Sequence, residues 1–296
     1  MKRKRRIFLT GGSGFIGRNI LEQLGEKYTF YAPSHKELDL KSFSAVEKYL
    51  KAYPVDIIIH SAKLGGTRKV QNSGEIAEIN VRMFFNLVRN EKYFKKMLFL
   101  GTGAEYDVSR SLIKVKEEDF DRVVPKDSFG FCKYICSKYV EKSDNIINLR
   151  LFGIYGKYED YELRFISNAI CKNLFGLPIT MHKNVFFDYL YMNDFVQILD
   201  YFLNHDVKEK FYNIGTGKSI DLLTIAQTIN RIGTRKSEII IRKKGLKNEY
   251  TCDNARLLRE IRGFIFTDFE KSVRELYEWY RNKKHSLKIE SFLIDR

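Results

Sequence analysis

Three glycines near the start of the chain have the spacing of a phosphate-binding turn. Gly11, Gly14 and Gly17 follow the short apolar run Arg6–Thr10 and open a segment with helical patterning. The first glycine permits a tight turn, the second lets the backbone approach a pyrophosphate, and the third lets the helix pack closely on the strand. The helix N-terminus then faces the phosphates. We therefore predict a dinucleotide site formed by Gly11, Gly14, Phe15, Ile16 and Gly17.

The residues after the second predicted strand bear on the choice between NAD and NADP. A site that prefers NAD usually has an acidic residue here, which binds the ribose 2′-hydroxyl. This chain instead has Ser34, His35 and Lys36 here, and the first carboxylate after the strand is that of Glu37. These side chains would receive a 2′-phosphate, so we expect NADP, with NAD as the alternative. Asp39 lies in the next turn, where a loop residue would meet the adenine.

The elements that position these residues alternate along the first half of the chain. The predicted strands are Arg6–Thr10, Thr29–Ala32, Val55–His60, Lys96–Gly101 and Ile146–Leu151. The predicted helices are Phe15–Leu24, Phe43–Tyr53, Glu75–Arg89 and Phe129–Glu141. Uninterrupted apolar strands that alternate with helices indicate a parallel sheet covered on both faces. We expect an α/β protein with a doubly wound parallel sheet of the Rossmann type.

The second half of the chain is less regular, with a strand-like run at Val185–Tyr191 and a long amphipathic helix around Phe269–Lys283. We expect a smaller α/β substrate domain over the carboxyl ends of the strands, where open α/β sheets bind ligands. In this interpretation residues 1–156, with a return segment at about 185–214, form the dinucleotide-binding domain. Residues 157–184 and 215–296 form the substrate domain.

The net charge of +15 suggests an anionic partner. The basic residues are scattered, however, and no helix-turn-helix, zinc-finger or RNP motif accompanies them. We therefore expect no nucleic acid, and a basic surface that steers a small molecule bearing phosphate. No run approaches the ~20 apolar residues of a membrane helix, so we expect no membrane association.

Cysteine usage and the first residues both favour a cytoplasmic protein. Cys132, Cys136, Cys171 and Cys252 form no CxxC pair and have no supporting histidines, so we expect free thiols and no metal site. The start MKRKRR looks like the beginning of a signal peptide, but the following apolar run IFLT ends at once in glycines. We expect this run to be a strand, with no export signal.

Further segments carry the motifs of one enzyme family. Residues 55–62 (VDIIIHSA) look like its fourth strand and the alanine turn beside the cofactor, which implies a cofactor contact at Ala62. Residues 150–156 (RLFGIYG) and 187–194 (FDYLYMND) match its R-x-x-N-x-Y-G and R-D-F-x-Y-V-x-D segments, with Gly153 and Phe187 as departures. Nearly the whole chain thus resembles the extended short-chain dehydrogenase/reductase family of nucleotide-sugar epimerases, dehydratases and reductases. Residues 62–66 and 98–102 resemble its GDP-fucose synthases in particular.

The resemblance implies a catalytic group of Ser or Thr, Tyr, and Lys four residues later. A phenol with a pKa near 10 is a poor base at neutral pH, and a lysine one helical turn away stabilises its phenolate and contacts the nicotinamide ribose. Thr102 and Lys133 match the first and last of these residues. The tyrosine is missing, because Phe129 stands in its place.

Tyr134 and Lys138 also satisfy Y-x-x-x-K. Five residues along a helix turn the side chain by ~140°, so Tyr134 would not face the cofactor if Lys133 does. Two explanations of Phe129 stay open. It is either a Tyr→Phe change that traps bound substrate, or the mark of a protein that binds without turnover. Under the first, Phe129→Tyr should raise the rate.

The residues after Thr102 narrow the reaction that the resemblance implies. The family's 4,6-dehydratases have Asp-Glu there, whereas this chain has Gly103 and Ala104. Ala104 also stands where GDP-fucose synthases have the cysteine of their epimerisation step. The remaining reactions are reduction or epimerisation at carbon 4 of a nucleotide-diphospho-sugar. The alternative is that the protein is not an enzyme and only binds a dinucleotide. The expected substrate contacts are Lys63, Thr102, Gly103, Arg164, Lys183 and Arg242.

The family resemblance also implies a homodimer, formed through the helices that carry Asn80 and Lys133. Asp194 is expected to cap the helix that follows it.

Overall fold

A six-stranded parallel sheet forms the centre of the computed structural model, which describes residues 3–65 and 74–293. Its spatial order is β2, β1, β3, β4, β6, β11, and neighbouring strands pair in parallel throughout. The strands are β1 (Arg6–Thr10), β2 (Thr29–Tyr31), β3 (Ile57–His60), β4 (Lys96–Thr102), β6 (Ile146–Leu151) and β11 (Phe211–Ile214). The predicted doubly wound sheet is therefore confirmed.

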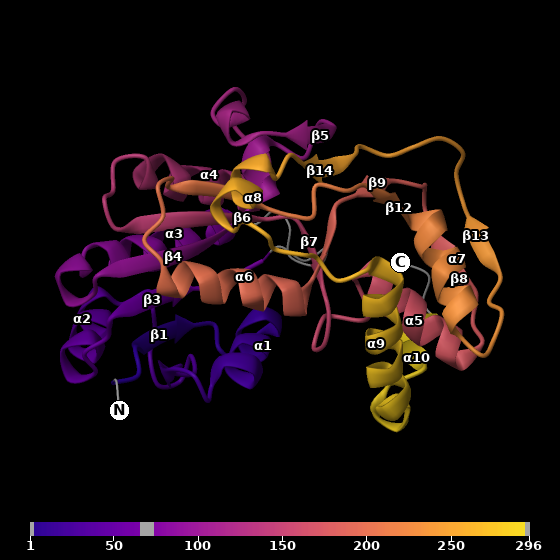
Figure 1. Ribbon diagram of the computed structural model, residues 1–296, viewed down its shortest axis with the longest axis horizontal. Coiled ribbons are helices and arrows are strands. Elements are labelled where there is room, and N and C mark those ends of the chain that lie inside the picture. The colour runs from indigo at the N-terminus through magenta and orange to yellow at the C-terminus, as the bar shows by residue number, and fades with distance from the viewer. Residues whose placement is uncertain (1–2, 66–73, 294–296) are drawn as a thin grey trace.

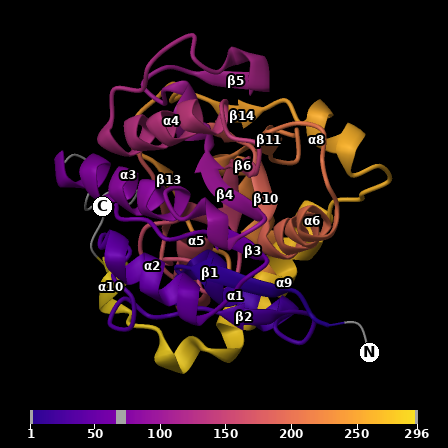
Figure 2. The ribbon, with the colours of Figure 1, turned by 90° about the vertical axis from the view of Figure 1, so that its left-hand side faces the viewer.

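Helices cover both faces of this sheet (Figures 1 and 2). One face carries α2 (Phe43–Ala52), α3 (Gly74–Val88) and α4 (Ser128–Val140), and the other carries α1 (Phe15–Leu24) and α6 (Met192–Asn204). Alternate residues of β1 enter the two layers: Ile7 and Leu9 pack in the core with α1 and α6, and Phe8 in the core with α2 and α3. Strands buried on both sides are mainly apolar on both faces, which is why β1 shows no alternation.

The predicted strand Val185–Tyr191 is wrong as a single element, because it divides at Asp188 into β9 (Phe186–Phe187) and β10 (Tyr189–Tyr191). The buried Asp188 carboxylate accepts hydrogen bonds from the backbone N–H groups of Thr216 and Gly217, both at 2.8 Å. This contact ties the break in the strand to the turn after β11. The two halves then join different sheets: β10 pairs with β7 (Gly153–Tyr155), and β9 joins a four-stranded sheet.

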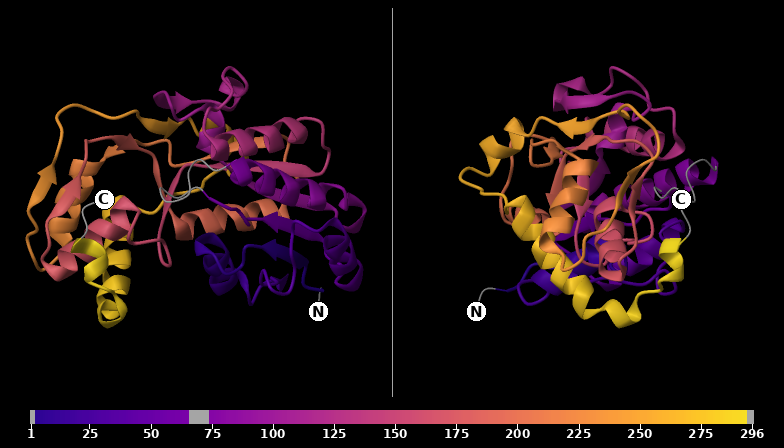
Figure 3. Two further views of the ribbon diagram at one scale, coloured as in Figure 1. Left: turned by 180° about the vertical axis from the view of Figure 1, so that it is seen from behind. Right: turned by 90° about the vertical axis from the view of Figure 1, so that its right-hand side faces the viewer.

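A second hydrophobic core lies beside the first, to the right in Figure 1 and to the left in the rear view of Figure 3. It contains side chains such as Tyr155, Ile170, Ile225 and Leu276. Its elements are α5 (Phe165–Phe175), α7 (Leu222–Ile232), α9 (Phe269–Asn282), α10 (Glu290–Leu293) and the ribbon of β8 (Ile179–Met181) and β13 (Ile239–Ile241). The expected C-terminal helix is thus α9.

The four-stranded sheet connects the two cores. Its order is β12 (Ile220–Asp221), β9, β14 (Tyr250–Cys252), β5 (Leu112–Val115), so that an excursion from the first half of the chain pairs with a strand from the last third. After β14 the chain returns to the large sheet, where Leu257 of α8 (Ala255–Glu260) joins the core with α6. We keep the two-domain division as a proposal, with α8 added to the dinucleotide-binding part.

The prediction for Asp194 is wrong. Asp194 lies in the first turn of α6, and its carboxylate accepts hydrogen bonds from the Thr267 backbone N–H at 2.9 Å and the Thr267 hydroxyl at 2.6 Å. It therefore anchors the segment that leads into α9. No helix in the described residues is long and apolar enough to cross a membrane. The four cysteines, all within the described part, are buried free thiols.

Candidate active site at the carboxyl edge of the sheet

The glycine turn after β1 has the shape that the sequence predicts. Gly11 has φ +73°, and a Cβ there would lie 2.8 Å from the Ala62 backbone nitrogen. A Cβ at Gly17 would overlap the Gly11 carbonyl. At Gly14, by contrast, the nearest atom to an added Cβ is the Gly11 carbonyl oxygen at 3.3 Å. Gly11 and Gly17 are therefore required by the protein's own packing, whereas Gly14 leaves room for the close approach of a ligand.

This turn lies at the topological switch point of the sheet. The chain passes from β1 to β2 on one side and then to β3 on the other, and doubly wound sheets bind nucleotides at such a point. Thr10 joins the carboxyl ends of β1 and β3. Its hydroxyl accepts a hydrogen bond from the Ala62 N–H at 3.1 Å and lies 2.8 Å from His60 Nδ1. Burial, together with the nearby charge of Lys133, lowers the pKa of His60 to about 3. His60 is therefore a neutral structural group.

The turn after β2 holds a carboxylate as well as the expected cations. Glu37 folds back and accepts a hydrogen bond from the Ser34 backbone N–H at 2.6 Å, and this bond lowers the pKa of Glu37. His35 and Lys36 are exposed at the same turn. Asp39 accepts from the Lys41 backbone N–H at 3.0 Å. From the sequence we expect Glu37 to lie beyond the ribose site. In the structure its carboxylate instead lies at Ser34, where the turn after β2 begins.

Thr102 ends β4 and caps the short 3-10 helix η2 (Gly103–Tyr106). Its hydroxyl accepts from the Ala104 N–H at 3.2 Å, and its own N–H donates to the Glu105 carboxylate at 3.0 Å. The backbone at Thr102 is thus held from both sides. A hydroxyl at the carboxyl end of a central strand can meet a ligand seated against the sheet edge.

Lys133 reaches the same edge from α4. Its amine donates to the Leu100 carbonyl at 2.8 Å and lies 4.3 Å from the centre of the Phe99 ring. Burial lowers the pKa of Lys133. Phe129, one turn earlier, is half-buried, and the Lys63 amine lies 5.2 Å from the centre of its ring.

Tyr134 and Lys138 lie in a different environment. Both side chains bind the carboxylate of Asp121, and Lys138 also pairs with Glu141. All four of these residues are at least partly exposed to solvent. The alternative Y-x-x-x-K pair is therefore engaged with Asp121, while the Lys133 side chain is buried and bonded to β4.

The basic residues predicted to bind substrate fall into two groups. Removal from water, and then the charges of Arg164 and Lys133, lower the pKa of Lys63 to about 8. The pKa of His182 is instead lowered by desolvation first, and to a smaller extent by nearby positive charges that include Lys183 and Arg242. That group lies on the ribbon of β8 and β13, at the end of the molecule far from β1 (Figure 1).

Sequence reasoning missed Tyr250, the first residue of β14. Its hydroxyl lies 3.4 Å from the Thr102 hydroxyl, and its ring packs against Phe152 at 4.9 Å between ring centres. Burial raises the pKa of Tyr250. No motif marks this residue in the sequence.

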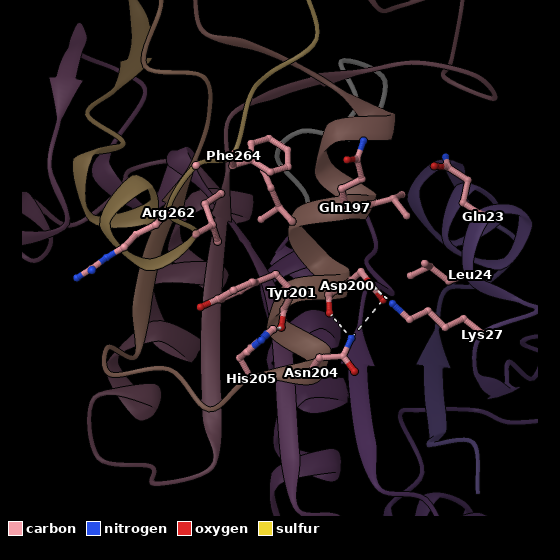
Figure 4. A pocket seen from close by; sticks show the side chains of 14 residues that line it. Gln23, Leu24, Lys27, Gln197, Asp200, Tyr201, Asn204, His205, Arg262 and Phe264 are labelled. Carbon is pink, nitrogen blue, oxygen red and sulfur yellow. Dashed lines mark hydrogen bonds and ion pairs between the residues drawn. The ribbon is translucent and has the colours of Figure 1, made fainter. Parts of the chain in front are cut away.

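An open groove elsewhere on the molecule carries none of the predicted site residues. It lies between α6, the C-terminal end of α1 and the segment after α8, and Gln23, Lys27, Asp200 and Arg262 line it (Figure 4). Asp200 is already bound there by Lys27 and Tyr28. Since the glycine turn is at the opposite end of α1, this groove is separate from the candidate active site.

Comparison with known proteins agrees with this geometry. The sequence model of the NAD dependent epimerase/dehydratase family matches residues 7–215. The chain belongs to this family. The match begins in β1 and ends just after β11, so it covers the whole central sheet of this family member.

The relatives of this epimerase/dehydratase family member include enzymes of GDP-sugars. GDP-L-colitose synthase from Yersinia pseudotuberculosis is 24% identical over 308 residues, which cover 95% of this chain and 99% of that protein. The GDP-L-fucose synthetase of Naegleria fowleri has a similar fold, with a TM-score of 0.83, 17% identity and coverage of 97% of this chain and 96% of that one. GDP-mannoheptose C4 reductase from Campylobacter jejuni, solved with NADP bound, has a TM-score of 0.78 and 19% identity. The match covers 95% of this chain and 99% of that one.

Proposed function

We propose that the protein is an NADP-dependent reductase or 4-epimerase that acts at carbon 4 of a nucleotide-diphospho-sugar. The observation that carries this proposal is the convergence of three features on one edge of the sheet. These are the open space at Gly14, the Thr102 hydroxyl and the buried amine of Lys133. The family assignment and the relatives named for GDP-sugars support it.

The residues present fit a dinucleotide. The glycine turn leaves room at Gly14, and Ala62 lies directly beside it. A bound nicotinamide would supply or accept the hydride. Thr102 would bind the sugar carbonyl oxygen, and Lys133 would hold positive charge at the edge of β4. Lys63 and Arg164 would meet the diphosphate, since both are basic and the charge of Arg164 acts on Lys63.

Two measurements test this function, with GDP-4-keto sugars as the first substrates. Calorimetry measures binding, and the absorbance of the reduced nicotinamide follows hydride transfer in a single turnover. We expect binding and hydride transfer by the chain as it stands or by its Phe129→Tyr variant. Absence of transfer in both forms across a panel of nucleotide sugars, with NADPH binding intact, would contradict the proposal. It would favour a non-catalytic dinucleotide-binding protein, the alternative that Phe129 itself supports.

The preference for NADP rests on Lys36 and His35 at the turn after β2, against the nearby carboxylate of Glu37. A charge-assisted contact contributes about 1.5–3 kcal/mol, roughly ten- to a hundredfold in affinity. We expect Lys36→Ala to weaken NADPH binding by that factor and to leave NADH binding unchanged. Lys51→Ala, at the end of α2, is the matched control. Tighter binding of NADH by the unsubstituted chain would refute the preference.

We also propose a homodimer formed through α3 and α4, which pack side by side on one face of the sheet (Figure 2). Phe131 of α4 is an exposed aromatic residue on this surface. Phe131→Glu should convert a dimer into monomers in analytical ultracentrifugation. A chain that sediments as a monomer before substitution would contradict the proposal.

A further inference from the structure

Tyr250 brings a phenol next to the Thr102 hydroxyl at the carboxyl end of β4. Its backbone is fixed on both sides, because its carbonyl accepts from the Asp188 N–H at 3.0 Å and the Glu249 carbonyl accepts from the Leu112 N–H at 2.8 Å. The rings of Phe152 and Phe187 pack against it, at 4.9 and 5.9 Å between centres. The hydroxyl is thereby held 3.4 Å from the Thr102 hydroxyl.

Two hydroxyls at this separation can serve one acceptor. A carbonyl oxygen placed at hydrogen-bond distance of about 2.7–2.8 Å from Thr102 Oγ1 can lie equally close to Tyr250 Oη, since the two donors are 3.4 Å apart. Gly103 preserves the space, because a Cβ at that position would lie 2.5 Å from Tyr250 Oη. A phenol, with an ordinary pKa near 10, keeps its proton at neutral pH, and burial raises the pKa of Tyr250 further. A protonated phenol is an acid, which is the group that reduction of a ketone requires.

We propose that Tyr250 is the catalytic acid of this protein and takes the role left vacant at Phe129. The inference rests on the proposed carbon-4 reduction. A bound reduced nicotinamide would supply the hydride for the new C–H bond at the carbonyl carbon. The π electrons of the carbonyl move onto its oxygen, and that oxygen takes the proton from Tyr250 Oη, whose O–H bond breaks. Water then returns a proton to the phenolate, so that one ketone, one reduced nicotinamide and one proton give one alcohol and one oxidised nicotinamide.

The experiment compares four forms of the full chain by single-turnover hydride transfer to a GDP-4-keto sugar. These are the unsubstituted chain, Tyr250→Phe, Phe129→Tyr and the double variant Phe129→Tyr/Tyr250→Phe. We expect Tyr250→Phe to lower the rate by ~10²–10⁴-fold, as loss of a general acid does. The double variant should recover a rate within about tenfold of the unsubstituted chain. Tyr134→Phe, whose hydroxyl binds Asp121, is the matched control and should leave the rate unchanged.

A binding measurement that needs no turnover accompanies these rates. Tyr250→Phe should bind the 4-hydroxy product roughly three- to tenfold more weakly by calorimetry on cofactor-free protein, and it should bind NADPH as tightly as the unsubstituted chain.

Three results would overturn the inference. The first is a Tyr250→Phe variant that keeps its rate within about threefold. The second is hydride transfer that appears only with Phe129→Tyr, whichever residue occupies position 250; this leaves the proposed carbon-4 reduction standing. The third is no transfer in any of the four forms with NADPH binding intact, which overturns the proposed function as well.

Discussion

Breaking the buried ion pair between Glu105 and Arg150 should strongly destabilise the fold, and Glu105 also contacts Thr102 of the candidate active site. Both side chains are fully buried, and the carboxylate accepts from Arg150 Nε at 2.7 Å, from Asn148 Nδ2 at 3.0 Å and from the Ser137 hydroxyl. Its second oxygen accepts from the Thr102 N–H. Glu105→Gln keeps the shape, removes the negative charge and leaves the guanidinium uncompensated.

The expected cost is large because the charge that stays behind has few ways to reach water. The guanidinium lies 4.2 Å from the centre of the Phe120 ring and 4.5 Å from that of Phe211, and its Nη2 has no hydrogen-bond partner among the described residues. Breaking such a pair costs about 3–5 kcal/mol. With an unfolding entropy of about 0.6 kcal/mol/K for a chain of this size, the melting temperature should fall by about 5–8 °C.

Urea and thermal unfolding, followed by circular dichroism, measure this loss. Glu78→Gln breaks an exposed pair with Arg82 and serves as the matched control, for which we expect less than about 1 kcal/mol. The double variant Glu105→Gln/Arg150→Met should be less destabilised than Glu105→Gln alone, because no charge is then left buried and unpaired. A Glu105→Gln variant as stable as the control would refute the reasoning.

Two further predictions concern the glycine turn and a buried carboxyl group. Gly14→Val should abolish NADPH binding in calorimetry, with a modest fall in the unfolding midpoint because an added Cβ would lie 3.3 Å from the Gly11 carbonyl oxygen; unchanged affinity would exclude Gly14 from the site. Burial raises the pKa of Glu159 to about 8, above its ordinary unfolded value of about 4.3. The folded state therefore holds the proton more tightly than the unfolded state. The free energy of unfolding should fall as the pH rises from about 4 to 8, by up to about 1.4 kcal/mol per pH unit. Glu159→Gln should remove this part of the pH dependence of the urea midpoint, and an unaltered profile would show that the carboxyl does not titrate in this way.

Local patterns in the sequence were sufficient to predict five of the six strands of the large sheet and the glycine turn, but not β11. The runs that became β1, β3 and β4 are mainly apolar on both faces, as a strand covered on both sides requires, whereas β6 also carries the buried polar residues Asn148 and Arg150. The glycines are three residues apart and act within one turn. Such signals extend over a few residues, so they can be recognised before any tertiary contact is known.

Only the tertiary structure decided which side chains meet at the carboxyl edge. The contact between Thr102 and Tyr250 joins residues 148 positions apart. It forms because β14 inserts between β5 and β9, and no pattern near Glu249 announces that pairing. Likewise Asp188, whose carboxylate binds the backbone of Thr216 and Gly217, divides a run that reads as one strand. Side-chain direction and long-range strand pairing come from packing of the whole chain, because each is set by neighbours that are distant in sequence.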